Sequence, residues 1–180
     1  MAFLSPSRAR GHPGHGISRY GQAMVSATVW AAIAFSGAPA AATSWGAIDA
    51  LRARLGNAGV KVVQRRCAQS GLKGMYHPGR EAIVICRNHP NPKAVWNTLA
   101  HEATHHMQAC VGGAITKRHH HRSMLRLLAS ESPLDVRSLE AYPRSQQLAE
   151  LEARYTAQLP PEQVLQLFDR YCPPPAASAP

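Results

Sequence analysis

The sequence of 180 residues lacks the repeats and long apolar runs that define several protein classes. It has no internal repeat at a fixed period, which argues against a solenoid. No uninterrupted apolar run reaches the ~20 residues of a membrane-spanning helix, although a shorter run lies near the N-terminus. Hydrophobic residues make up 45% and charged residues 17% of the chain, as in ordinary globular proteins. We therefore expect one domain with a modest core, because the length leaves no room for two large domains.

Acidic residues are scarce, with 10 Asp and Glu against 20 Lys and Arg, and none lies in residues 1–22, which contain Arg8, Arg10 and Arg19. A short apolar run at 24–35 and small residues at 36–43 follow. This order predicts a secretory signal peptide at 1–42, with Met24 as an alternative start and an uncleaved N-terminal anchor as the alternative structure. We expect a secreted or periplasmic protein that stays basic and has no stable membrane span after the signal is removed.

The sequence has no CxxC pair, so a structural zinc site made of cysteines is not expected. Its four cysteines (Cys67, Cys86, Cys110 and Cys172) all lie after the expected signal peptide. An even number of cysteines in a small exported domain predicts disulfides, and four cysteines allow three pairings. Chain order favours Cys67–Cys86 across a hairpin and Cys110–Cys172 between the C-terminal helix and a central helix.

The apolar periodicity and the turn signals predict an α+β domain over residues 43–172, with a small antiparallel sheet followed by several helices and stabilised by disulfides. Pro78-Gly79 indicates a turn between the last two strands, and Asn91-Pro92 indicates the start of a long helix that ends at Gly112. Residues 173–180 form a Pro/Ala tail that has nothing to bury. The expected helices are 45–55, 92–111, 123–130, 145–159 and 161–171, and the expected strands are 60–67, 72–76 and 81–86.

The long central helix carries an HExxH motif, from His101 to His105. Spacing of four residues places both imidazoles on one face of the helix, one turn apart, where both can bind a single Zn²⁺. Glu102 lies beside them and can accept a proton from a zinc-bound water. Two surface histidines on an amphipathic helix are the alternative interpretation.

With this motif the sequence resembles the zincin metallopeptidases, and among them the compact gluzincin-like group, over roughly residues 74–158. The resemblance implies a zincin-like fold, in which a strand precedes the HExxH helix and a Glu on a later helix provides the third metal ligand. The metzincin branch is excluded, because it requires Gly and a third His where this chain has Gln108 and Val111.

The segment 149–157 is similar to the Glu-x-Glu-Ala segment of gluzincin-like families, which implies Glu150 as the third ligand. In those families small residues three and seven positions later, here Ala153 and Ala157, let the two helices approach each other. A helical wheel favours Glu152 instead, because Glu152 falls within the apolar arc while Glu150 lies opposite, and a carboxylate facing a core must be paired or metal-bound. The remaining candidates are Glu131, Asp135 and Glu140.

Arg154 departs from the family pattern, which often has an acidic residue four positions after the ligand. The resemblance still implies an exported zinc metalloendopeptidase that hydrolyses peptide bonds by a zinc-bound water activated by Glu102. Its partner would be a protein or peptide substrate, which we expect to add to the exposed edge of the strand ending at Cys86. The second group that stabilises the oxyanion stays open among Tyr142, Tyr155 and His106.

The alternative function is a non-catalytic exported binding module on a zincin-like fold, with a basic face toward an anionic partner. The intact Glu102 favours the enzyme, because metal binding alone does not need it. The basic run 117–122 is expected to be a solvated loop, and without a nucleic-acid motif no specific nucleic-acid partner is expected. We expect Trp96 in the core and His106 on the helix surface.

Overall fold

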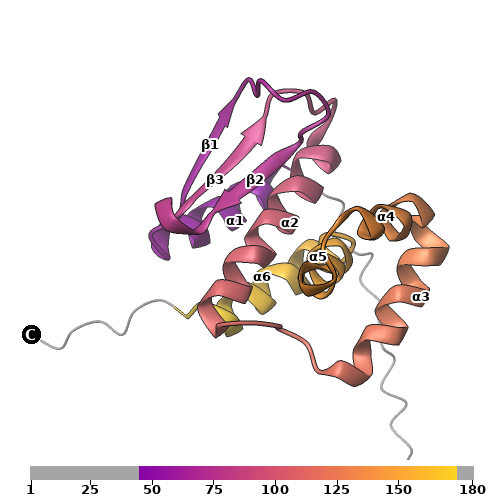
Figure 1. The fold of residues 1–180 in the computed structure, drawn as a ribbon. Helices are drawn as coiled ribbons and strands as arrows, with labels where there is room; N and C mark the ends of the chain where they lie inside the picture. The colour runs from indigo at the N-terminus through magenta and orange to yellow at the C-terminus, as the bar shows by residue number, and fades with distance from the viewer. Residues whose placement is uncertain (1–44, 174–180) are drawn as a thin grey trace, which may run out of the picture. The chain divides into compact units, whose positions relative to one another are not determined.

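The computed structural model describes residues 45–173 (Figure 1), so the signal peptide expected at 1–42 and all of the expected tail except Pro173 lie outside the described residues. Within the described range the protein is α+β, with a three-stranded sheet, six α-helices and two disulfides. No helix of this range is both long and apolar enough to cross a membrane. The elements are α1 (Trp45–Asn57), β1 (Lys61–Arg65), β2 (Gly74–His77), η1 (Pro78–Arg80), β3 (Ala82–Cys86), α2 (Pro92–Val111), η2 (Arg118–His120), α3 (His121–Glu131), α4 (Pro133–Ser138), η3 (Leu139–Ala141), α5 (Arg144–Ala157) and α6 (Pro161–Tyr171).

The sheet is mixed, so the expectation of an antiparallel sheet is wrong. Its strand order is β1-β3-β2, in which β2 pairs antiparallel and β1 pairs parallel with β3. The turn at Pro78–Arg80 joins β2 to β3 as predicted. Because β2 reverses the chain direction, β1 and β3 run the same way, and β1 takes the free side of β3 rather than pairing with β2.

The two disulfides have the predicted pairing. Cys67–Cys86 joins the residues that follow β1 to the end of β3, so it links two parallel neighbours rather than the two strands of a hairpin. Cys110–Cys172 joins the last turn of α2 to the residue after α6. Both bonds therefore fix elements that pack directly against the central helix or within the sheet.

The central position of β3 in the sheet contradicts the expectation that a substrate adds to an exposed edge of this strand. The strand ending at Cys86 has a neighbour on each side, so its edge is not exposed. The edge strand that packs against α2 is β2. Any added strand on this side of the sheet would pair with β2.

The helix α2 lies at the centre of the fold, between the sheet and α5 (Figure 1). The side chain of Asn91 accepts a hydrogen bond from the Ala94 amide, Pro92 occupies the first turn, and Gly112 ends the helix at φ 72°. These are the start and stop signals that the sequence predicts. The main core joins α1, α2, α6 and the sheet, and Trp96 is buried in it as expected.

A second, smaller cluster of buried apolar residues lies between α3 and α5, and it contains Met124, Leu128, Leu139 and Leu151. The helix α5 is therefore covered on two sides, by α2 and by α3. Ala153 and Ala157 of α5 are buried, in agreement with a close approach of α5 to α2. This packing brings the middle of α5 next to the HExxH segment.

Candidate metal centre

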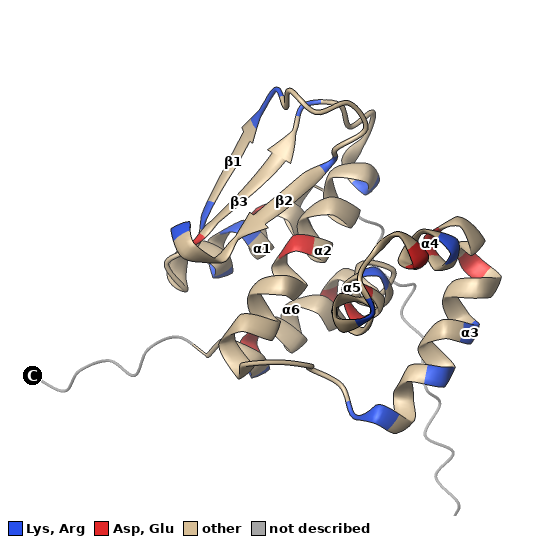
Figure 2. Ribbon diagram, in the orientation of Figure 1, with Lys and Arg blue, Asp and Glu red and all other residues tan. Residues whose placement is uncertain are grey.

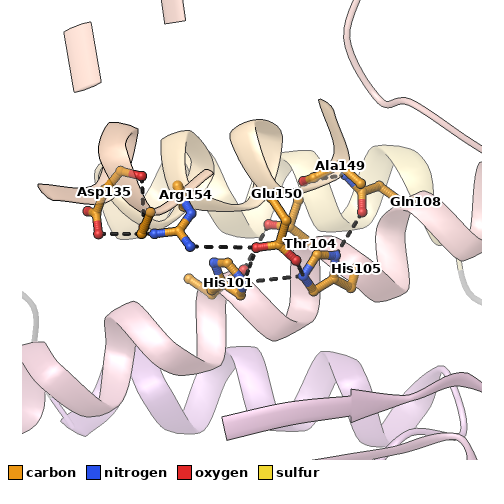
Figure 3. Close-up of polar contacts among 10 residues, drawn as sticks. His101, Thr104, His105, Gln108, Asp135, Ala149, Glu150 and Arg154 are labelled. Atoms are coloured by element: carbon orange, nitrogen blue, oxygen red, sulfur yellow. Dashed lines mark hydrogen bonds and ion pairs between the residues drawn. The ribbon is translucent and has the colours of Figure 1, made fainter. Parts of the chain in front are cut away.

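The side chains of His101 and His105 on α2 and of Glu150 on α5 converge on one point (Figure 3). The two Nε2 atoms of the histidines are 3.2 Å apart. Glu150 places Oε2 3.5 Å from Nε2 of His101 and Oε1 3.4 Å from Nε2 of His105. Ligands of a tetrahedral zinc ion at 2.0–2.1 Å are about 3.4 Å from one another. The spacing of these three groups therefore fits such an ion.

Two further observations agree with a cation at this point. The Oε2 atom of Glu150 is buried and has no hydrogen-bond partner, and a buried acceptor without a partner is costly. Two imidazoles and one carboxylate are also a donor set that suits zinc. Another group of potential ligands in the described residues, His106 with Cys110 and Cys172, has both of its sulfur atoms in the disulfide.

The surroundings of the two histidines shift their pKa values in opposite directions. Burial and the neighbouring His105 lower the pKa of His101 to about 4, so this ring is neutral near pH 7. Burial also lowers the pKa of His105, but its hydrogen bonds with Glu150 and Gln108 outweigh burial and raise the pKa overall. The same histidines and Arg154 outweigh burial at Glu150 and lower the pKa of that carboxyl. Glu150 is thus held as the anion beside the two rings.

Glu102 lies on the side of α2 that faces the sheet, only 7% exposed. The backbone amide of Tyr76 in β2 donates a hydrogen bond to its carboxylate, yet burial dominates and raises the pKa of Glu102 to about 7. A Cβ atom at Gly74 would lie 3.3 Å from Oε1 of Glu102 and 2.5 Å from Cγ2 of Thr98. Only glycine at position 74 allows β2 to lie this close to the helix.

The ring of His105 is oriented by Gln108, one turn further along α2. Nδ1 of His105 lies 2.9 Å from Oε1 of Gln108, whose amide nitrogen donates to the Ala149 carbonyl and to Oε2 of Glu152. Because both amide hydrogens of Gln108 are engaged on α5, its oxygen faces the histidine and accepts the Nδ1 proton. This leaves the lone pair of Nε2 free for a metal ion.

The structure separates the two carboxylates between which the sequence left a choice. Glu150 joins the histidines, whereas Glu152 is fully buried and accepts hydrogen bonds from the Ile115 amide, from the amide and hydroxyl of Thr116, and from Gln108. The wheel placed Glu150 away from the core, but Glu150 is only 8% exposed because α2 covers that face. The other candidates do not join the histidines: Glu131 and Glu140 are exposed, and Asp135 pairs with Arg154.

Arg154 links the candidate metal ligand Glu150 to Asp135 of α4. Its guanidinium lies 3.2 Å from Oδ1 of Asp135 and 3.9 Å from Oε2 of Glu150, and it stacks over the ring of Tyr142 at 5.7 Å. The Nε atom of Arg154 is buried without a hydrogen-bond partner. Arg154 therefore lies close to the candidate ligands, with its charge balanced by Asp135.

A cleft of about 800 Å³ opens beside the three candidate ligands. His101 and Glu102 form part of its wall, with the chain from Gly71 to Gly74 on one side and Tyr142 and Arg154 on the other. Tyr142 is thus the one of the three expected oxyanion-stabilising groups that lines this cleft. Tyr155 packs against the cluster between α3 and α5.

The sequence suggested that His106 lies on the surface of the helix, but in the structure its side chain is buried and only 6% exposed. Its Nδ1 lies 3.1 Å from the hydroxyl of Tyr76, and its ring stacks on Phe168 of α6. Burial lowers the pKa of His106, although Glu81 opposes this effect. The expectation failed because α6 and β2 cover this face of α2, which a single helix pattern does not reveal.

Three contributors to the site were missed from the sequence: Gly74, Gln108 as a partner of His105, and the Tyr76 amide. Gln108 had a usable signal, since a polar residue three positions after a candidate ligand lies on the same helical face. Gly74 and Tyr76 had none, because their roles depend on the long-range packing of β2 on α2. Comparisons with protein-family models, with curated proteins and with solved structures gave no significant match to this chain.

Proposed function

We propose that this protein is an exported zinc-dependent metallopeptidase with a zincin-like fold. The observation that carries the proposal is the convergence of His101, His105 and Glu150 within metal-ligand spacing, next to an open cleft that His101 and the buried Glu102 line. Pure metal binding does not require Glu102, whereas hydrolysis does. The two disulfides support export, because such bonds persist in oxidising compartments.

His101, His105 and Glu150 would hold the zinc ion. Bound zinc acts as a Lewis acid that acidifies water and polarises a peptide carbonyl. Glu102 would accept the proton of the attacking water and return it to the leaving amine. Its burial and its pKa of about 7 suit a group that must both take and release a proton near neutral pH.

The edge of β2 would hold the substrate in an extended conformation. This strand borders the cleft through Gly74, and its Tyr76 amide already faces Glu102. A peptide that pairs with β2 would thus pass directly over the catalytic carboxylate, with main-chain hydrogen bonds supplying affinity. Tyr142, on the opposite wall, is the candidate donor for the negative charge that develops on the carbonyl oxygen.

The first test is the metal content of the purified protein after loading with zinc and dialysis. We expect about one zinc per chain, lost in His101→Ala and Glu150→Ala. Glu140→Ala is the matched control, because it removes an exposed carboxylate and should keep the metal. Retention of zinc in Glu150→Ala would overturn the ligand assignment.

The second test separates an enzyme from a binding module. We expect the wild type to cleave an unfolded protein substrate such as casein, and Glu102→Gln to keep its zinc while losing activity by about 10²–10⁴-fold. Chelation should abolish cleavage, and zinc should restore it. A zinc-loaded wild type that cleaves no member of a mixed-sequence peptide library would refute the peptidase and favour the binding module.

A further inference from the structure

Exposed cations gather at the end of the sheet toward which β1 and β3 point. We call Arg65, Arg66, Lys73, Arg87 and Lys93 the sheet-end cluster. The backbone amide of Arg87 donates a hydrogen bond to the carbonyl oxygen of Arg65 at 2.9 Å. The backbone amide of Cys86 donates one to the carbonyl oxygen of Lys73 at 2.8 Å. Figure 2 shows the blue segments together at this end, without red among them. The ends of β1 and β3 and the segment before β2 are thus neighbours in space.

Salt bridges among the described residues do not neutralise the charge of this cluster, although the cleft that Lys73 lines also contains Glu102 and Asp135. Glu81 is the single acidic residue between Ala58 and His101, and it precedes β3, about 17 Å from the far end of that strand. Within the part of the chain that the structure describes, no ion pair involves a member of the cluster. Like charges held together repel, so the cluster does not stabilise the fold.

The cluster is held in place by covalent and backbone restraints. Cys67, next to Arg66, is bonded to Cys86, next to Arg87. The parallel pairing of Arg65 with Cys86 holds the strand ends side by side. Because the backbone is already fixed, binding an anion here would lose little conformational entropy, which favours recognition.

The cluster continues into the candidate cleft. Lys73 and His89 line that cleft together with His101 and Glu102. A peptide paired with β2 and extended at about 3.3 Å per residue would leave the catalytic centre past Lys73 within a few residues. We propose that the sheet-end cluster binds an acidic stretch of the polypeptide substrate, close to the bond that is cleaved. The identity of the ligand as a polypeptide rests on the proposed peptidase function.

The test measures binding and cleavage separately. The binding probe is a fluorescein-labelled peptide with an apolar centre and Asp residues on both flanks, compared with the same peptide carrying Asn. Binding to the Glu102→Gln protein is followed by fluorescence anisotropy, so no cleavage is needed. We expect the Asp peptide to bind more tightly, and R65Q/R66Q/R87Q in that background to weaken its binding about tenfold at low salt.

The matched control is K117Q/R118Q/R122Q, which removes the same number of exposed positive charges at η2 and α3. We expect this control to keep the preference for the Asp peptide. Equal loss in both triple variants would show a net-charge effect and overturn the proposal. Equal affinity of the Asp and Asn peptides, or binding of heparin without binding of the Asp peptide, would overturn it as well.

Cleavage of the same two peptides by proteins that retain Glu102 tells this proposal apart from the peptidase function. We expect kcat/KM for the Asp peptide to fall about tenfold in R65Q/R66Q/R87Q and to stay the same for the Asn peptide. Charge-dependent binding without cleavage of either peptide would support the cluster as an acidic-peptide site and count against the peptidase, which the peptide library then tests. Cleavage without any preference for Asp would support the peptidase and overturn the cluster.

Discussion

The side-chain oxygen of Gln108 lies 2.9 Å from Nδ1 of His105, and the amide nitrogen of the same side chain lies 2.9 Å from Glu152. One residue therefore connects a candidate metal ligand to a buried carboxylate on another helix. The bonds on α5 leave Gln108 no freedom to turn its amide around. We infer that Gln108 sets the tautomer and the orientation of His105.

Replacement of Gln108 should therefore weaken metal binding without removing a ligand. We expect Gln108→Leu to reduce zinc affinity by about 10–100-fold, the usual effect of losing a hydrogen-bond partner of a metal-bound histidine. Competition with a chromophoric chelator measures this change. Gln146→Leu, on the exposed surface of α5, is the control. Unchanged zinc affinity in Gln108→Leu would show that His105 is oriented without it.

Glu152 should support stability rather than metal binding. Its carboxylate is fully buried and accepts hydrogen bonds from Ile115, Thr116 and Gln108. Removal of the acceptor that these buried donors share leaves them unsatisfied, which typically costs about 1–3 kcal/mol. We expect Glu152→Ala to lower the free energy of unfolding by this amount in urea titrations, while the folded fraction keeps its zinc. Glu162→Ala, an exposed site on α6, is the control, and loss of zinc from folded Glu152→Ala would contradict the assignment.

The local features of the site could be predicted from the sequence. Asn91, Pro92 and Gly112 define α2 by interactions within a few residues, so the helix and the HExxH motif on it were predictable. The strand pairing of the sheet could not be predicted from the sequence. The parallel pairing of β1 with β3 joins segments about 20 residues apart, so it leaves no local pattern. The requirement for glycine at position 74 could not be predicted either, because it comes from the close packing of β2 on Thr98 of α2.

The choice between Glu150 and Glu152 shows why a helical wheel fails here. A wheel assumes one buried face, but α5 is covered both by α2 and by the cluster between α3 and α5. Both carboxylates are therefore buried, on different sides and with different partners. The family-like Glu-x-Glu-Ala spacing selected the residue that faces the histidines, because that spacing reflects the contact between two helices.

Gly74 should control the distance between the edge strand and the HExxH helix. A Cβ atom there would lie 2.5 Å from Cγ2 of Thr98 and 3.0 Å from the Val84 carbonyl oxygen. We expect Gly74→Ala to destabilise the protein by about 1–3 kcal/mol and to lower kcat by displacing β2 from Glu102. Thermal and urea denaturation measure the first effect, and peptide cleavage measures the second.

Two variants show whether the cause is the steric contact. Gly79→Ala should be nearly neutral, because a Cβ atom there has no neighbour within 4 Å. Thr98→Ser removes Cγ2 but keeps the hydroxyl that donates to the Ala94 carbonyl. The double variant Gly74→Ala/Thr98→Ser should recover part of the stability. A double variant no more stable than Gly74→Ala would place the strain elsewhere.

Glu102 should make the stability of the metal-free protein depend on pH. Burial raises its pKa to about 7 in the folded state, against an ordinary value of 4.5. Below the ordinary value the carboxyl is protonated in both states, so its burial costs nothing extra. As pH rises through the interval between these two values, the unfolded chain releases the proton while the folded protein retains it. The contribution of Glu102 to stability is therefore lost with rising pH, by about 3 kcal/mol in total.

The neighbouring groups make the comparison with Glu102→Gln essential. His101 has a lowered pKa, so its contribution to stability is lost as pH falls from 6.5 to about 4, which overlaps this interval. Glu150 also has a lowered pKa, but its contribution is lost below pH 4.5. The difference in unfolding free energy between wild type and Glu102→Gln cancels most of those contributions. In the presence of a chelator, we expect the free energy of unfolding of the wild type to fall relative to that of Glu102→Gln as pH rises from 4.5 to about 7. A difference that stays constant over this range would mean that the Glu102 carboxylate is solvated in the folded protein.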